Sequence, residues 1–159
     1  VLQGEYRYDP QEYHGPTLYY LTLPILKILG ASDIAQIDEA ALRLVPLLAG
    51  ISLIAFLPVI GNGLPRIAVL VSAALTAVSP AMVFYSRYYI QEMLLVAASF
   101  FLFAFLWRAA QTRKQMWLVL AGIALGFLHA TKETDVLTLF AILFGAAATI
   151  FWTQTIDKR

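Results

Sequence analysis

The residues best suited to chemistry are gathered in segment 8–20, which reads Tyr-Asp-Pro-Gln-Glu-Tyr-His-Gly-Pro-Thr-Leu-Tyr-Tyr. Two carboxylates, Asp9 and Glu12, stand beside Tyr13 and His14 in a stretch whose prolines and glycine favour fixed turns over a regular helix. A carboxylate can take a proton from a reacting hydroxyl group, and the aromatic rings can contact a polar ligand. The segment is therefore a candidate site. The alternative is an interfacial loop whose tyrosines anchor the protein among lipid headgroups.

The composition of the chain indicates that this segment belongs to a membrane protein. Hydrophobic residues make up 60% of the sequence, and the mean hydropathy of +0.74 is well above that of a soluble domain. A net charge of +1 argues against a nucleic-acid partner, which would require a basic face. The sequence contains no cysteine, so no disulfide or thiol chemistry is expected. It begins at Val1 without a Met or a signal peptide, which predicts a piece of a longer protein.

Charged residues divide the rest of the chain into long apolar runs. The runs that carry no charge are 44–65, 67–86, 93–107, 115–131 and 136–156. A helix needs about 20 residues to cross the hydrocarbon core, a length that the runs 93–107 and 115–131 do not reach. If those two helices span the membrane, Glu92 and the pair Lys132-Glu133 must lie at or just inside its border.

The expected fold is all-α: a polytopic membrane helical bundle of about five transmembrane helices with one or two interfacial helices. One interfacial helix is predicted over 17–29, a stretch too short to span. Residues 1–43 then form an extracytoplasmic loop with juxtamembrane helices, and residues 44–159 form a single transmembrane domain.

Two features bear on the shape and packing of these spans. The second span is predicted over 67–85 and contains Ser79-Pro80 near its end. In the fourth span, Gly122, Gly126 and Ala130 recur at helical spacing. Such stripes of small residues let helices approach closely in lipid, so this one predicts a packing face.

The basic loop at 109–115 predicts the orientation of the bundle. It is short, follows Arg108 and contains Arg113 and Lys114, and such a basic loop favours the cytoplasmic side. Alternating outward from this loop brings segment 8–20 and the ends of several spans to the extracytoplasmic side. The ionisable residues that converge there are Arg43, Arg87, Glu92, Lys132 and Glu133. Their convergence predicts one shared pocket at the outer border of the membrane.

Each of these residues could instead have a purely structural role. Arg87 and Lys132 are candidate clamps for a phosphate, but an arginine at a membrane border is also typical of a side chain that snorkels to the headgroups. For Glu92 the alternatives are a role in catalysis and an ion pair with Arg87, five residues earlier. His14 could contact a phosphate or a metal, or hydrogen-bond within its turn; one histidine does not make a metal site. His129 is expected to pack or to hydrogen-bond.

Several motifs occur together in the order seen in one group of membrane proteins. They are Tyr8-Asp9-Pro10, Tyr13-His14-Gly15-Pro16, Arg43-Leu44-Val45-Pro46, Tyr85-Ser86-Arg87-Tyr88 and Ala130-Thr131-Lys132-Glu133. The chain resembles the family 39-type glycosyltransferases, which are related to the protein mannosyltransferases and to the aminoarabinose transferase of lipid A. Its likeness is greatest to the prokaryotic flippase-activity-associated proteins of N-glycosylation.

This resemblance implies a GT-C membrane fold and a polyprenyl-phosphate-linked sugar as donor. The sugar would pass to a protein, lipid or glycan acceptor on the extracytoplasmic face of the plasma membrane. In the family an acidic pair after the first span is taken as the general base, and no such pair precedes Asp9 here. The base is therefore expected upstream of Val1, and this piece alone is expected to be inactive. No cofactor is implied with certainty, and a divalent metal is left open.

The candidate site residues follow from these considerations. The catalytic candidates within the chain are Glu92 and Asp9. The substrate-binding candidates are Tyr13, His14, Arg43, Arg87, Lys132 and Glu133.

Two other classes of function fit parts of the sequence. A lipid-linked-sugar flippase, or its accessory, would share the outer recognition site but needs a polar path through the bundle. The spans hold no charge deep in the bilayer, which counts against it. A non-catalytic membrane scaffold predicts that changes to the outer polar residues cause no more than modest destabilisation.

Overall fold

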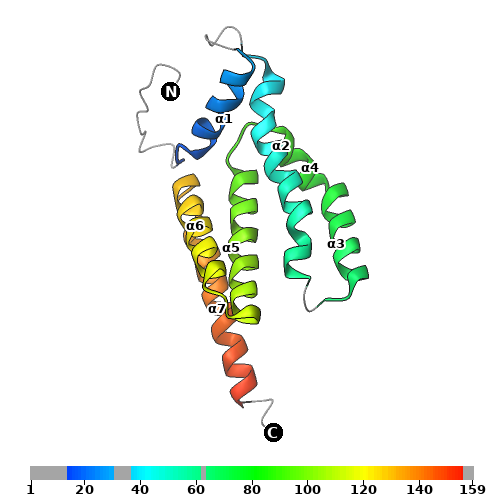
Figure 1. Ribbon diagram of the computed structural model, residues 1–159, viewed down its shortest axis with the longest axis vertical. Coiled ribbons are helices and arrows are strands. Elements are labelled where there is room, and N and C mark those ends of the chain that lie inside the picture. The colour runs from blue at the N-terminus through cyan, green and yellow to red at the C-terminus, as the bar shows by residue number, and fades with distance from the viewer. Residues whose placement is uncertain (1–13, 31–36, 62–63, 156–159) are drawn as a thin grey trace.

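The computed structural model describes residues 14–30, 37–61 and 64–155. Every regular element in these ranges is a helix (Figure 1), which confirms the all-α prediction. The helices are α1 (Thr17–Ile28), α2 (Glu39–Phe56), the 3₁₀ helix η2 (Leu57–Ile60), α3 (Arg66–Val78), α4 (Pro80–Arg87), α5 (Glu92–Thr112), α6 (Gln115–Thr131) and α7 (Asp135–Thr155).

The five apolar runs of the sequence all form helices, but the helices differ in length. By length and composition, three are able to cross a membrane: α2 with η2 (Glu39–Ile60), α5 and α7. The pair α3 and α4 adds a fourth if it is one broken span. Helix α6 has 17 residues, or about 25 Å of helix, and is shorter than the hydrocarbon core. The shortness expected for run 115–131 is confirmed.

The second predicted span is two helices rather than one. Helix α3 ends at Val78, and α4 starts at Pro80 with its axis turned by 56°. Ser79, between them, is extended (φ −61°, ψ 122°). A proline disfavours the helical region for the residue before it and fits the first turn of the helix that it begins. Ser79-Pro80 therefore breaks the span and redirects its last two turns.

Helix α5 lies at the centre of the bundle, with α6 on one side and α2 on the other (Figure 1). The α5–α6 core contains the buried residues Ala98, Leu102, Ala121, Ala124 and Leu128. A second cluster, of Leu18, Val45 and Leu94, joins α1 and α2 to the N-terminal part of α5. Alanines at these contacts let the helix backbones approach closely. The two clusters fix the ends of α1, α5 and α6 relative to one another.

Other helix faces remain uncovered in the described part of the chain. A methyl group added at Gly122 or Gly126 would meet nothing within 4 Å, so the small-residue stripe of α6 is not a packing face there. On α7, Asp135 is buried and Leu139 and Ile142 pack on the α5–α6 core, while most of the other apolar residues along the helix are exposed. Apolar surfaces of this kind in a membrane protein face lipid or further helices.

Candidate active site

The segment before α1 is fastened to the end of α6. His14 and Lys132 form an isolated antiparallel bridge, and the backbone N–H of Gly15 donates to the carbonyl of Thr131 at 3.0 Å. A Cβ atom at position 15 would lie 1.8 Å from the carbonyl oxygen of Ala130. The approach of the two backbones therefore requires a residue without a side chain. In this way the Tyr-His-Gly-Pro and Thr-Lys-Glu motifs, far apart in sequence, lie side by side.

A pair of threonine hydroxyls holds the same junction together. Thr17, the first residue of α1, donates its hydroxyl to Oγ1 of Thr131 at 3.0 Å. Thr131 is fully buried, and its own hydroxyl donates to the carbonyl of Phe127 at 2.7 Å. Sequence reasoning did not select either threonine as a site residue. The signal was the position of Thr131 directly before Lys132 in the Thr-Lys-Glu motif.

Replacing Thr131 with valine is expected to loosen this junction. The valine fills the same space but leaves the Thr17 hydroxyl without its acceptor, at a cost of about 1 kcal/mol of unfolding free energy. Threonine to serine keeps the hydroxyl and should retain most of that stability. Thermal unfolding of the two variants of the full-length protein checks this; a loss in the serine variant with none in the valine variant would show that the methyl group, rather than the hydroxyl, matters.

Glu92 and Lys132 form the charged centre of the junction. Lys132 Nζ donates to Glu92 Oε1 at 2.8 Å, with the two side chains 20% and 32% exposed. His14 lies within electrostatic range of Glu92. The partner of Glu92 is thus Lys132, directly after the end of α6. The ion pair with Arg87, which was one of the two alternatives for Glu92, does not form in the described part of the chain. A partly exposed pair of this kind contributes little to stability, so a ligand can take the place of either partner.

The linker between α4 and α5 turns two tyrosines toward different neighbours. The Tyr89 hydroxyl hydrogen-bonds to that of Thr22 in α1 at 2.9 Å, and its ring meets the edge of Tyr19. Burial raises the pKa of the Tyr89 hydroxyl above its ordinary value, against the opposing effect of the hydrogen bond with Thr22, so this phenol is neutral. Tyr88 instead stacks on Phe84, with ring centroids 4.5 Å apart.

Arg43 and Arg87 do not join this centre. Both line a separate cavity of about 600 Å³ between α2 and α4. In the ranges that the structure describes, no hydrogen bond or ion pair links either arginine to Glu92 or Lys132. The structure therefore places the described candidates at one end of the bundle but in two groups: the arginines in their own pocket, and Glu92 with Lys132 at the junction. Asp9 and Tyr13 lie outside the described residues, and Glu133 is exposed in the turn after Lys132.

Asp135 is a buried carboxylate that sequence reasoning did not select. Its side chain is 2% exposed, and Oδ2 lies 3.1 Å from Nδ1 of His129, which confirms a hydrogen-bonding role for that histidine. Its other oxygen has no hydrogen-bond partner among the described residues. Across those residues, no three His, Cys, Asp or Glu side chains are grouped so that they could hold a metal ion.

An apolar groove lies within the bundle, between helices that carry the charged centre at their ends. It has a volume of about 490 Å³ and lies between α1, α2, α5 and α6. Its walls run along α5 from Leu94 to Phe105 and along α6 from Phe127 to Leu120. The groove reaches Leu94, two residues after Glu92 on α5, and Phe127, five residues before Lys132, so one end of it lies close in sequence to both members of the pair, although neither of them lines it. A long hydrocarbon chain fits such a lining, with a polar group at its end.

Comparison with known protein families agrees with the fold and the motifs. A family model described as dolichyl-phosphate-mannose-protein mannosyltransferase matches residues 14–159, which include every helix described above. No curated protein and no solved structure matches the chain significantly. The matched region begins at His14 and continues past Lys132, so it covers both sides of the junction. The chain therefore belongs to the dolichyl-phosphate-mannose-protein mannosyltransferase family, a group of membrane glycosyltransferases of the GT-C type.

Proposed function

We propose that this protein transfers a sugar from a polyprenyl-phosphate donor to a hydroxyl group of a protein or glycan acceptor. The observation that carries the proposal is the apolar groove, which reaches Leu94 and Phe127, close in sequence to the Glu92–Lys132 pair. A lipid-linked sugar has a hydrocarbon chain joined to a phosphate and a sugar. The groove suits the chain, and Lys132 suits the phosphate.

Each residue of the cluster then has a role in one displacement step. The acceptor oxygen attacks the anomeric carbon of the sugar and loses its proton to a carboxylate. The bond from that carbon to the phosphate oxygen breaks, and the electron pair leaves with the polyprenyl phosphate. Lys132 stabilises the charge on the departing phosphate, with His14 as a second contact. Glu92 and Asp9 are the carboxylates proposed to act in this chain, together with the acidic base that the family resemblance implies upstream.

The remaining candidates line the approach to this centre. Tyr13 and Glu133 flank His14 and Lys132 in the sequence and are proposed to contact the sugar or the acceptor. Arg43 and Arg87 are proposed to contact an anion in their own pocket. We place the reaction on the extracytoplasmic face of the plasma membrane because the basic residues Arg108, Arg113 and Lys114 lie at the opposite end of α5.

The direct test is transfer from a labelled donor by the full-length protein in lipid vesicles. Sugar-labelled polyprenyl phosphate is added on one side, and label is measured on the lipid, in solution and on a hydroxyl acceptor. We expect the label to leave the lipid and to appear on the acceptor. Labelled lipid that crosses the bilayer intact would identify a flippase instead, and label that neither moves nor transfers would identify a scaffold.

Filling the apolar groove should impair use of long donors selectively. Ala49 on α2 lines the groove, and phenylalanine at this position would occupy part of its volume. We expect the KM for a long polyprenyl donor to rise about tenfold, because about 1.4 kcal/mol of apolar contact is lost. The KM for a donor with two isoprene units should change little.

The matched control for this change is Ala74→Phe. Ala74 lies exposed on α3, outside the groove, so the added ring meets no groove wall. A rise in KM that is the same for long and short donors in Ala49→Phe would show that the groove does not hold the prenyl chain.

A further inference from the structure

The pocket of Arg43 and Arg87 concentrates positive charge. Its lining consists of the two arginines and of Val78, Pro80, Val83, Phe84 and Tyr88, with no acidic residue among them. In the part of the chain that the structure describes, Arg87 has no hydrogen-bond or ion-pair partner. The cavity therefore offers a guanidinium group that has no described counter-ion.

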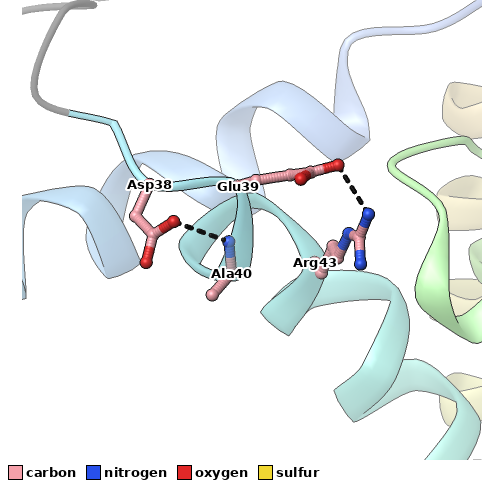
Figure 2. Close-up of polar contacts among 4 residues, drawn as sticks. All are labelled: Asp38, Glu39, Ala40 and Arg43. Atoms are coloured by element: carbon pink, nitrogen blue, oxygen red, sulfur yellow. Dashed lines mark hydrogen bonds and ion pairs between the residues drawn. The ribbon is translucent and has the colours of Figure 1, made fainter.

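Arg43 is only partly neutralised. Figure 2 shows its guanidinium directed toward Glu39, one helical turn earlier, while Asp38 caps the start of α2. The side chain of Glu39 is 75% exposed, and an exposed pair at this spacing contributes little. One nitrogen of Arg43 makes the contact with Glu39, and the guanidinium has other N–H groups to offer. An anion in the cavity can therefore meet both arginines.

The pocket is separated from the proposed transfer site by the linker between α4 and α5. Tyr88 contributes to the wall of the arginine pocket, whereas Tyr89 packs toward α1 and Leu94. The apolar groove, in turn, contains neither arginine in its lining. Under the proposed function, a donor lipid whose chain occupies the groove has its phosphate at Lys132, so the arginines are left for a different ligand.

The apolar side of the pocket is continuous with an exposed apolar surface on α3. Val78 is 71% exposed at the end of α3, and Ile67, Leu70 and Leu75 are exposed along the same helix. No residue of α3 or α4 is buried in the described structure. A molecule with a phosphate in the pocket could thus extend acyl chains along α3. A water-soluble anion would leave these walls unused.

We propose that the pocket of Arg43 and Arg87 binds the phosphate of an anionic membrane lipid other than the sugar donor. The two guanidinium groups hold the phosphate diester, and the acyl chains lie against Val78, Val83 and the exposed face of α3. Arginine forms paired hydrogen bonds with phosphate oxygens, and basic pockets between membrane helices are suited to lipid headgroups. The assignment does not depend on the transfer reaction, since it uses none of the residues of the Glu92–Lys132 centre.

Native mass spectrometry of the full-length protein in detergent tests the proposal in the absence of any sugar donor. The protein is titrated with phosphatidylglycerol and with phosphatidylcholine of the same acyl chains. We expect tighter binding of phosphatidylglycerol, and an approximately tenfold loss of that preference in the double variant Arg43→Gln/Arg87→Gln. Arg66→Gln, which removes an exposed arginine at the opposite end of α3, should keep the preference.

Several results would overturn the assignment. Equal binding of the two lipids by the unaltered protein would do so, as would an equal loss of preference in Arg66→Gln. Displacement of phosphatidylglycerol by inorganic phosphate would show a site for a free anion, and displacement by polyprenyl phosphate would assign the pocket to the donor. If the double variant does not fold, Arg87→Gln and Arg87→Lys replace it: lysine should restore part of the preference that glutamine removes.

Discussion

Replacement of Glu92 by glutamine in the full-length protein is expected to lower kcat for sugar transfer by about 10²–10⁴-fold, the usual contribution of a positioned acid or base. Glutamine has the shape of glutamate but cannot take a proton from the acceptor. It also removes the negative charge that holds Lys132 at 2.8 Å. The ammonium group stays free to meet the donor phosphate, so the KM for the donor should change much less than kcat. Initial rates at several donor concentrations separate the two quantities.

The matched control is Glu39→Gln, which breaks a second glutamate ion pair of the described structure. Glu39 is exposed and pairs with Arg43 on the same helix. This pair does not include Glu92 or Lys132. We expect kcat to stay within about twofold, because exposed pairs at this spacing contribute only about 0.3–0.5 kcal/mol. Both variants should insert into the membrane like the unaltered protein. Near-normal turnover by Glu92→Gln would favour the scaffold alternative.

The helices could be predicted from the sequence because their length and composition are set by the bilayer. Runs without charge, bounded by Arg43, Arg66 or Asp135, can only be buried in lipid or in protein, and the helix satisfies their backbone groups. The dipeptide Ser79-Pro80 was noted in the sequence, but the sequence did not predict that it breaks the span into two helices. Proline in a membrane helix is often tolerated, so the 56° turn depends on packing between α2 and α4 that no local pattern contains.

The site was predicted as a set of residues but not as an arrangement. The lengths of the uncharged runs predict where helices end, and so they predict that Arg87, Glu92 and Lys132 lie at one end of the bundle. They do not predict how the side chains are directed. Which way each side chain points depends on the linker between α4 and α5, where successive tyrosines face different neighbours. The turn at Pro80 also redirects α4 and carries Arg87 toward Arg43. The single group of residues expected from the sequence is therefore two: the arginine pocket and the Glu92–Lys132 pair.

The small-residue positions show a similar limit. The sequence predicted a close packing contact at Gly126, because it belongs to a stripe of small residues at helical spacing. It predicted none at Gly15. In the structure it is Gly15 that makes the close backbone contact, whereas the space beside Gly126 is open. A stripe of small residues indicates where a helix could approach, but only the tertiary arrangement determines whether one does.

Replacement of Gly15 by alanine is expected to have the largest effect of any single methyl group in the described chain. The new Cβ would lie 1.8 Å from the carbonyl oxygen of Ala130, and that oxygen belongs to backbone, which cannot rotate away. The loop must therefore move off the end of α6. It would lose the hydrogen bond from Gly15 to Thr131 and the bridge between His14 and Lys132. A displacement of about 1 Å at a reacting centre can cost roughly 10² in rate.

The comparison with Gly126→Ala separates displacement of the loop from the general effect of adding a methyl group. Gly126 lies within α6, the same helix that receives the loop, and an added Cβ there meets no atom within 4 Å. Alanine favours helix over glycine by about 1 kcal/mol, so this variant should be as stable as the unaltered protein or more stable. Transfer activity should fall about 10²-fold in Gly15→Ala and stay near normal in Gly126→Ala. If Gly15→Ala kept full activity, the loop would not need to dock on α6 for the reaction, and His14 would have no part in it.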